Sequence, residues 1–447
     1  MKWSKFNYIY KSKKHGYFIY NAVTNSFLRI NEELYGICRM VESDFTKISL
    51  IDLKIQKELV KAKILTTEYD DENYIIQAKY LKRLRSFNQT SLGLVIAPTY
   101  TCNFACPYCY EENLPNIHMS EAVEDNIITF IKSFEIAKEL LLCWHGGEPL
   151  LRFDSIKNIL SKIRSTPEIN LTQHHLVTNG YLLDEYKCDF FREHNLASVQ
   201  ITIDGLAATH NINRKHKSGV PTFDTIIKNI DYIVDNLPDC KVILRVNVHD
   251  GNKDEYPELR KFILDKWGDR NIYYHFRYAK SHGKCQVACL ENKNKLQFAI
   301  DLYKRHNIKE IEFYPIGSNL GGCTADSNNS FVIGPKGELY KCWVDVGKKD
   351  REIGSITEST LNLPLISEYL VGTDKFNDAK CTNCFLFPVC DGGCSIYRQI
   401  FKQTGKEYDV CPINPGDLGL ILDLYFEQYL NSTPTISNEK NKVSIFC

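Results

Sequence analysis

The sequence predicts an α/β protein built on a partial (β/α)6 barrel of the TIM type, with a smaller module before it and a cysteine-rich region after it. Three observations support this prediction. The 447 residues exceed what one ordinary hydrophobic core holds. Strand-like and helix-like runs alternate between residues 92 and 278. Most of the 17 cysteines fall in two blocks, at residues 102–109 and 323–411.

The first 88 residues predict a separate α+β module. Runs rich in β-branched and aromatic residues occupy positions 6–30, and two runs with apolar residues at helical spacing follow at 30–65. Strands followed by helices are typical of a winged-helix-like domain. We expect residues 79–91, KYLKRLRSFNQTS, to link this module to the barrel.

The barrel is predicted over residues 89–310. Its strands are expected at 92–98, 139–147, 173–180, 198–205, 241–248 and 272–278. Amphipathic helices are expected between them at 121–134, 154–164, 184–195, 223–237 and 256–268. Six βα units are too few for a closed eight-stranded barrel, so we expect an incomplete one, with its active site at the C-terminal ends of the strands.

Composition and charge narrow the function classes. The formal net charge is zero, which gives no electrostatic case for nucleic-acid binding, and no apolar run is long enough to cross a membrane. The first 14 residues lack the apolar core of a signal peptide, so a cytoplasmic protein is expected. In that compartment many cysteines indicate metal or redox chemistry. The positive balance of residues 1–88 is either an ordinary solvated surface or a docking face for an acidic peptide.

The first cysteine block places Cys102, Cys106 and Cys109 on one loop directly after the first predicted barrel strand. A zinc site built from these thiolates needs a fourth ligand. A 4Fe–4S cluster instead leaves its fourth iron open to a substrate or cofactor, which is what a catalytic centre requires.

This spacing, with Tyr108 before the last cysteine, resembles the cluster loop of radical S-adenosylmethionine (SAM) enzymes. The resemblance implies that the open iron binds the amino and carboxylate groups of SAM. It also implies that one electron cleaves a C–S bond of SAM and gives a 5′-deoxyadenosyl radical, which abstracts hydrogen. It assigns no general base, so the catalytic residue is unknown.

Further motifs follow in the order of that family. HGGEP at 145–149 ends the second strand and resembles the motif that holds the SAM amino group, with glycines that permit close backbone approach and a glutamate acceptor. TNG and ITIDG end the third and fourth strands, and an arginine downstream resembles one that pairs with the SAM carboxylate. The SAM-binding residues implied are Tyr108, Gly146, Gly147, Glu148, Asn179, Thr202, Asp204 and Arg214.

The second cysteine block resembles a SPASM domain, the C-terminal extension of radical SAM peptide-modifying enzymes, and we place it at 311–430. The resemblance implies two auxiliary 4Fe–4S clusters; zinc ribbons are the structural alternative. Cluster I takes Cys323, Cys342 and Cys394, and cluster II takes Cys381, Cys384, Cys390 and Cys411. The fourth position of cluster I either is filled by Cys285 or Cys289 or remains open.

The remaining cysteines have no partner at ligand spacing and are expected to fill apolar sites. They are Cys38, Cys143, Cys188, Cys240 and Cys447. The last segment, 431–447, is expected to be a polar tail.

Together these features predict a peptide maturase with SAM and three 4Fe–4S clusters as cofactors. It would install a thioether or carbon–carbon crosslink in a ribosomally made precursor peptide, whose leader segment binds residues 1–88. A low-potential donor such as flavodoxin or ferredoxin would supply electrons, and neither nucleic acid nor membrane is an expected partner. The alternatives are an anaerobic sulfatase-maturating enzyme and a zinc-stapled peptide-binding protein without catalysis.

Overall fold

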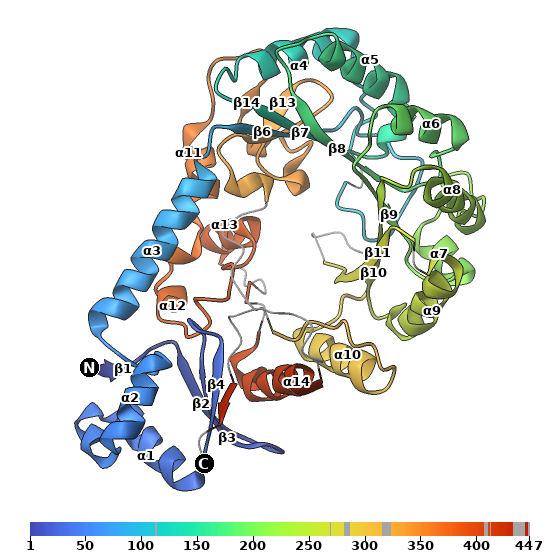
Figure 1. The fold of residues 1–447 in the computed structure, drawn as a ribbon. Coiled ribbons are helices and arrows are strands. Elements are labelled where there is room, and N and C mark those ends of the chain that lie inside the picture. The colour runs from blue at the N-terminus through green and yellow to red at the C-terminus, as the bar shows by residue number, and fades with distance from the viewer. Residues whose placement is uncertain are drawn as a thin grey trace. The chain divides into compact units, whose positions relative to one another are not determined.

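A computed structural model describes residues 1–111, 114–268, 270–280, 287–314, 323–405, 410–411, 413–431 and 443–445. The chain forms two compact units, shown in Figure 1. Unit 1 comprises residues 1–86, 307–322 and 368–447, and unit 2 comprises residues 87–306 and 323–367. These units cut across the predicted domain ranges, because the stretch 323–367 joins the barrel.

Unit 2 is built on one sheet with the strand order β11-β10-β9-β8-β7-β6-β12-β13-β14. Strands β6 to β11 are all parallel and stand in chain order, which confirms the predicted α/β partial barrel. They are β6 (Ser91–Ile96), β7 (Glu139–Trp144), β8 (Leu171–Thr178), β9 (Ser198–Thr202), β10 (Lys241–Val248) and β11 (Ile272–Tyr278).

Helices cover the outer side of these strands (Figure 1). They are α4 (Glu121–Lys132), α5 (Phe153–Arg164), α6 (Glu185–Glu193), α7 (Ala207–Asn213), α8 (Phe223–Asn236) and α9 (Tyr256–Trp267). In α5, Ile156, Ile159, Leu160 and Ile163 are buried at helical spacing, which is why this segment folds as a helix against the sheet. Helices α10 (Asn292–Lys304) and α11 (Leu363–Ser367) complete the unit.

The sheet continues beyond the barrel strands through a long-range pairing. Strand β12 (Ser330–Ile333) lies parallel to β6, with Val332 opposite Val95, and β13 (Glu338–Tyr340) and β14 (Gly354–Ser355) follow antiparallel. A Cβ atom at Gly93 would lie 2.7 Å from Oγ of Ser330, so glycine is what lets the two strands pack at this point. This pairing explains why residues 323–367 belong to the barrel unit.

Unit 1 contains the strands and helices expected in the N-terminal module. The sheet has the order β15-β4-β3-β2, and a short pair joins β1 to β5. Its strands are β1 (Lys2–Trp3), β2 (Asn7–Ser12), β3 (Gly16–Asn21), β4 (Ser26–Ile30), β5 (Leu65–Thr66) and β15 (Val443–Ile445). Its helices are α1 (Glu32–Ser43), α2 (Leu53–Lys61), α3 (Glu68–Ser86), α12 (Ala379–Thr382), α13 (Ser395–Thr404) and α14 (Leu418–Asn431).

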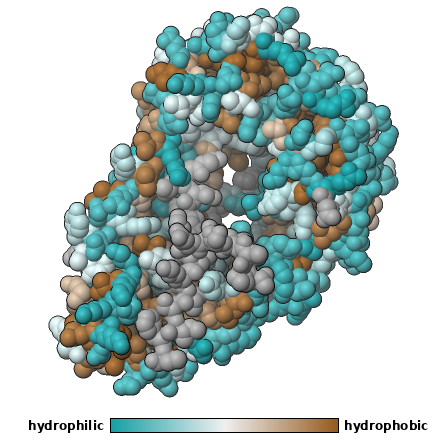
Figure 2. All heavy atoms as spheres, viewed as in Figure 1, coloured by the Kyte–Doolittle hydropathy of each residue, from teal (hydrophilic) through white to brown (hydrophobic). Residues whose placement is uncertain are grey.

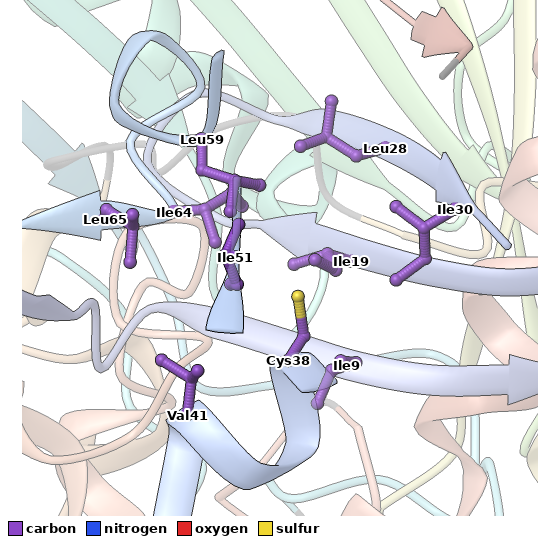
Figure 3. Close-up of a cluster of buried hydrophobic side chains, with 10 residues drawn as sticks. All are labelled: Ile9, Ile19, Leu28, Ile30, Cys38, Val41, Ile51, Leu59, Ile64 and Leu65. Atoms are coloured by element: carbon purple, nitrogen blue, oxygen red, sulfur yellow. The ribbon is translucent and has the colours of Figure 1, made fainter. Parts of the chain in front are cut away.

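A small apolar core holds the N-terminal elements together. Ile9, Ile19 and Leu28 from the strands face Cys38 and Val41 of α1 (Figure 3). The burial of Cys38 agrees with its expected role as a small apolar residue.

Two contacts correct the picture of an independent module followed by a linker. The predicted link at 79–91 is helical as far as Ser86, and Arg83 of α3 donates hydrogen bonds to the carbonyl of Leu370, at 3.0 Å, and to Asp374. The C-terminal helix α14 packs on the strands through Phe426, whose ring centroid lies 4.9 Å from that of Phe18. Residues 1–86 therefore share their packing with residues near the other end of the chain.

The surface agrees with the balanced composition. The face in Figure 2 is largely hydrophilic, with apolar side chains in scattered patches. Within the described ranges, no helix combines the length and the hydropathy needed to span a bilayer.

Candidate active site

The loop that carries the first three cysteines follows β6 and is fixed by a neighbouring segment of unit 2. The amide of Ala105 donates to the carbonyl of Lys215 at 2.8 Å, and the amide of Lys217 donates to the carbonyl of Asn103 at 2.8 Å. Phe104 forms a β-bridge with His216 between these two bonds. The cysteine loop is thus held in place before any ligand binds.

Burial changes the protonation of the thiols on this loop. Burial raises the pKa values of Cys102 and Cys109 to about 12, so these groups would be neutral without a metal or other strong cation to hold them as thiolates. The amide of Phe104 donates to the sulfur of Cys102 at 3.4 Å. No three His, Cys, Asp or Glu side chains in the described ranges are placed to share one ion. A 4Fe–4S cluster does not require three side chains at one ion, because each thiolate binds a different iron.

The glycines of the HGGEP turn serve the protein's own backbone. Gly146 has φ of +119°, and a Cβ atom there would lie 2.5 Å from the carbonyl oxygen of Thr99. A Cβ at Gly147 would lie 2.3 Å from the carbonyl oxygen of Thr101. The amide of Glu148 donates to that same carbonyl at 2.9 Å. Both glycines therefore allow close contact with the residues leading into the cysteine loop, and their expected approach to a ligand stays a prediction.

Replacing Gly147 by alanine tests this contact. We expect Gly147→Ala to displace the loop and to lower the free energy of unfolding by about 1–3 kcal/mol, the usual cost of overpacking. Thermal unfolding and iron content after anaerobic reconstitution measure both effects. Gly36→Ala in α1 is the control, since nothing lies within 4 Å of its Cβ position. Equal iron content and equal stability for Gly147→Ala and the unchanged protein would contradict the contact.

Glu148 links the ends of β7 and β8. Its carboxylate is fully buried and accepts hydrogen bonds from the Thr178 hydroxyl at 2.7 Å, the Asn179 amide at 2.8 Å and the Leu150 amide at 3.1 Å. Burial raises the pKa of this carboxyl group, while these donors favour its charged form. Its expected contact with the SAM amino group stays a prediction; the structure adds a role in positioning Asn179.

Asn179 connects that strand end to the cysteine loop. Its side-chain amide donates to Oδ1 of Asn103 at 2.8 Å and lies 3.9 Å from the sulfur of Cys102. Thr202 lies at the end of the next strand, β9, opposite Arg245 of β10. The structure therefore gathers the predicted strand-end residues at the same edge of the sheet as the thiols.

Tyr108, Asp204 and Arg214 form a network beside the cysteines, in which Asp204 and Arg214 are buried and Tyr108 is partly buried. The Tyr108 hydroxyl donates to Oδ2 of Asp204 and accepts from Nη1 of Arg214 at 3.2 Å. The amide of Asn247 donates to Oδ1 of Asp204 at 2.7 Å. Burial raises the pKa of Asp204. Burial also disfavours the charged form of Arg214, but the nearby Cys106 helps to hold the pKa of this guanidinium above its usual range.

One donor in this network has no hydrogen-bond partner among the described residues. This donor is Nε of Arg214, which is buried together with the rest of the residue, at 9% exposure. The guanidinium also lies over the Phe104 ring, 5.6 Å from its centroid. A carboxylate is the natural partner for a guanidinium held in this way.

A second group of side chains at this edge was not predicted. His145 contacts the Tyr110 hydroxyl through Nε2 at 3.2 Å, and its ring centroid lies 4.6 Å from that of Trp343. Burial lowers the pKa of His145 to about 4, so this imidazole is neutral near pH 7. Tyr110 and His145 adjoin the cysteine and glycine motifs and could have been found from that proximity. Trp343 could not, because the pairing of β12 with β6 brings it near.

The cysteines predicted for auxiliary cluster II lie in unit 1 on connected segments. The amide of Cys384 donates to the carbonyl of Cys381 at 3.0 Å. The amide of Gly392 donates to the sulfur of Cys390 at 3.3 Å. A Cβ at Gly393 would lie 2.4 Å from the carbonyl of Val410, which places the residue before Cys411 against this loop.

The other predicted cysteines are distributed between the units. Residues next to Cys323 and Cys342 touch in unit 2, where Nε1 of Trp343 donates to Oγ1 of Thr324 at 3.1 Å. Cys394 belongs to unit 1, so the ligand set of cluster I stays a prediction. Cys289 is partly buried, whereas Cys285 and Cys447 lie outside the described residues. Cys188 and Cys240 are buried as expected, and Cys143 is partly buried.

Comparisons with known proteins agree with this geometry. The model of the Radical SAM superfamily matches residues 96–263. The serine-type anaerobic sulfatase-maturating enzyme of Klebsiella aerogenes is 26% identical over 318 residues, covering 66% of this chain and 76% of that protein. The cysteine-type enzyme of Clostridium perfringens is 24% identical over 349 residues, covering 71% and 92%.

Solved structures share the fold. That of anSMEcpe with bound AdoMet and the Cp18Cys peptide has a TM-score of 0.58 at 20% identity and covers 76% of this chain and 98% of that one. Streptococcus suis SuiB bound to S-adenosylmethionine has a TM-score of 0.53 at 17% identity and covers 92% and 100%. The cysteine loop, the glycine turn and the Tyr108–Asp204–Arg214 network thus occur together in the segment that the family model matches, and residues 96–263 form a radical SAM domain.

Proposed function

We propose that this chain is a peptide maturase that cleaves SAM at the C-terminal edge of β6–β11 and installs an oxidative crosslink, a thioether or a carbon–carbon bond, in a precursor peptide. The observation that carries the proposal is the Tyr108–Asp204–Arg214 network beside the cysteine loop. When bound, the 4Fe–4S cluster and SAM supply a radical that abstracts hydrogen. The protein supplies binding, orientation and exclusion of side reactions.

The residues of the network have separate tasks in this proposal. Cys102, Cys106 and Cys109 hold the cluster. Arg214 offers its unpartnered Nε to the carboxylate of SAM, and Tyr108 keeps the guanidinium in place through the 3.2 Å bond. These tasks need the side chains to be held in place, and the burial of Asp204 and Arg214 supports that.

The inner face of the last strands supports a polar substrate. Along β10 the side chains of Val242, Leu244 and Val246 are buried, while Arg245 and Asn247 on the opposite face are only partly buried. Their partners in β11, His275 and Arg277, are polar as well. A face of this kind suits contact with a solvated polypeptide rather than a fully packed barrel interior.

Known relatives support a peptide as the substrate. Both relatives described above are named as sulfatase-maturating enzymes, and solved neighbours hold the Cp18Cys peptide or the precursor peptide SuiA. The likeness to SuiB covers 92% of this chain against 76% for anSMEcpe. This wider coverage favours a precursor peptide over a sulfatase, which remains the second candidate because of the sequence matches.

Residues 1–86 are proposed to bind the leader of the precursor. Lys11 of β2 and Lys13 in the turn that follows it are exposed, and both would present positive charge to an acidic leader. We expect Lys11→Glu with Lys13→Glu to weaken binding of the precursor peptide about tenfold while SAM cleavage stays unchanged. Lys54→Glu on α2 is the control, since it changes the charge of an exposed residue elsewhere in the unit. Equal affinity for the charge-reversed protein and the control, by isothermal titration, would contradict a docking role for this turn.

The proposed function is tested with anaerobically reconstituted protein and two substrates. One is a candidate precursor peptide chosen from short open reading frames near the gene, and the other is a sulfatase peptide carrying Ser or Cys. We expect 5′-deoxyadenosine, and a precursor lighter by two hydrogens per crosslink in the mass spectrum. An aldehyde in the sulfatase peptide alone would establish the second candidate. Colourless protein that contains zinc and no iron would exclude both.

A further inference from the structure

Arg398 of α13 lies against a predicted ligand of auxiliary cluster II. Its Nη2 donates to the sulfur of Cys381 at 3.0 Å, its Nη1 donates to Oδ2 of Asp378 at 2.7 Å, and its Nε donates to the carbonyl of Gly392 at 2.6 Å. The side chain is 11% exposed. The guanidinium is therefore fixed from three directions and cannot turn away from the sulfur.

The same group of cysteines receives a second N–H donor. The amide of Gly392 donates to the sulfur of Cys390 at 3.3 Å, and Lys375 donates from Nζ to the carbonyl of Cys390 at 2.7 Å. The ammonium of Lys375 also lies 4.3 Å from the centroid of the Phe387 ring. Two sulfurs of the predicted cluster II ligands thus accept hydrogen bonds. Two basic side chains, Arg398 and Lys375, lie beside these cysteines.

Asp378 places a negative charge beside the same cysteine sulfur. It precedes α12, which carries Cys381, and its Oδ1 accepts from the amide of Lys380 at 2.9 Å. Its Oδ2 accepts from Arg398 and lies 3.6 Å from the sulfur of Cys381. The cysteine sulfur therefore lies next to one cation and one anion, both held at short range.

Charges and hydrogen bonds at this range act on an iron–sulfur cluster in a known direction. Reduction adds one negative charge to the cluster, and a donor or a cation beside a ligand sulfur stabilises that charge. A carboxylate at the same place destabilises it. Arg398 thus favours the reduced form and Asp378 opposes it.

We propose that Arg398 and Asp378 together set the reduction potential of auxiliary cluster II, held by Cys381, Cys384, Cys390 and Cys411. This inference rests on the proposed function, since it requires a cluster at these four residues. The step affected is the uptake of the electron that a substrate radical gives up, together with a proton, when it closes into a crosslink. Arg398 makes the cluster a better acceptor for this electron.

Two substitutions separate tuning from a merely structural role, because they act in opposite directions. We expect Arg398→Gln to make the midpoint potential more negative and Asp378→Asn to make it more positive, each changing the reduction equilibrium by about tenfold, or about 59 mV for one electron. Glutamine removes the cation, and asparagine keeps the acceptor that caps α12. The readout is an anaerobic redox titration followed by electron paramagnetic resonance, with iron and sulfide content measured on the same samples.

Lys402→Gln is the matched control. Lys402 lies one turn further along α13, and its Nζ pairs with Glu368 at 2.9 Å instead of a cysteine. Midpoints for Arg398→Gln and Asp378→Asn that both equal the control, at full iron content, would overturn the inference. If Arg398→Gln binds less iron, Asp378→Asn becomes the deciding variant. A midpoint potential for Asp378→Asn equal to that of the control would then overturn the inference.

A separate variant isolates failure of the underlying function. Cys381→Ala should lose the iron and sulfide of one cluster. Unchanged metal content in Cys381→Ala would show that no cluster forms at these residues and would refute the proposed auxiliary site itself. Loss of that iron in Cys381→Ala, together with unchanged midpoint potentials in Arg398→Gln and Asp378→Asn, would refute only the tuning by Arg398 and Asp378.

Discussion

Replacing Cys102, Cys106 and Cys109 together by alanine is expected to remove about four iron atoms per chain, one cluster's worth, and to stop release of 5′-deoxyadenosine. The activity should fall by at least about 10³-fold, as it does when a group essential to the chemistry is removed. All three thiols lie on a loop fixed by backbone hydrogen bonds to Lys215 and Lys217, so the fold should survive the change. Iron analysis and chromatography of the nucleoside products measure the two effects.

A matched control uses three other thiols. Cys38, Cys188 and Cys240 are buried in apolar surroundings and lie outside the predicted ligand sets. Replacing these by alanine should lower stability through small cavities, while iron content and SAM cleavage remain. The assignment of the SAM cluster would be wrong if the two triple variants bound equal amounts of iron.

Substituting Arg214 is expected to have the second largest effect. Arg214→Met should weaken SAM binding by at least tenfold, or about 1.4 kcal/mol, because the proposed carboxylate partner loses a charged, preorganised donor. Arg214→Lys should recover only part of this affinity, since an ammonium cannot both contact Tyr108 and present a second donor from the same plane. Equilibrium binding of SAM to the reconstituted protein measures both.

Lys217→Met is the control for this pair. Lys217 lies in the same segment with an exposed side chain, and its bond to Asn103 comes from the backbone and is kept. SAM affinity for Arg214→Met no lower than for Lys217→Met would exclude the proposed carboxylate contact.

The barrel could be predicted because its signals are local. Alternating burial along β10 and helical spacing along α5 are written in consecutive residues, and the motifs at strand ends follow from where each strand stops. Tyr108, Asp204 and Arg214 were named from motif order alone, and the structure brings them together. Neighbouring parallel strands end at one edge, so residues placed there by sequence meet in space.

What the sequence did not reveal depends on contacts between distant segments. The pairing of β12 with β6 joins residues more than two hundred positions apart, and no local pattern announces it. The same holds for Trp343 beside His145, and for Arg83 of α3, which donates to the carbonyl of Leu370 from a stretch where a linker was predicted. The motif HGGEP can be recognised in the sequence, but the contacts of its glycines with the carbonyl oxygens of Thr99 and Thr101 cannot, because these depend on the folded loop.

The pairing of β12 with β6 has a consequence for anyone who wishes to shorten this protein. A version ending near residue 310, at the predicted barrel boundary, would strip β6 of a neighbour and leave an uncovered row of amides and carbonyls along Gly93–Ile96. Other chains can form hydrogen bonds with unpaired strand edges of this kind. Trimmed material should therefore precipitate, and a cut placed after β14 should give a better-behaved core.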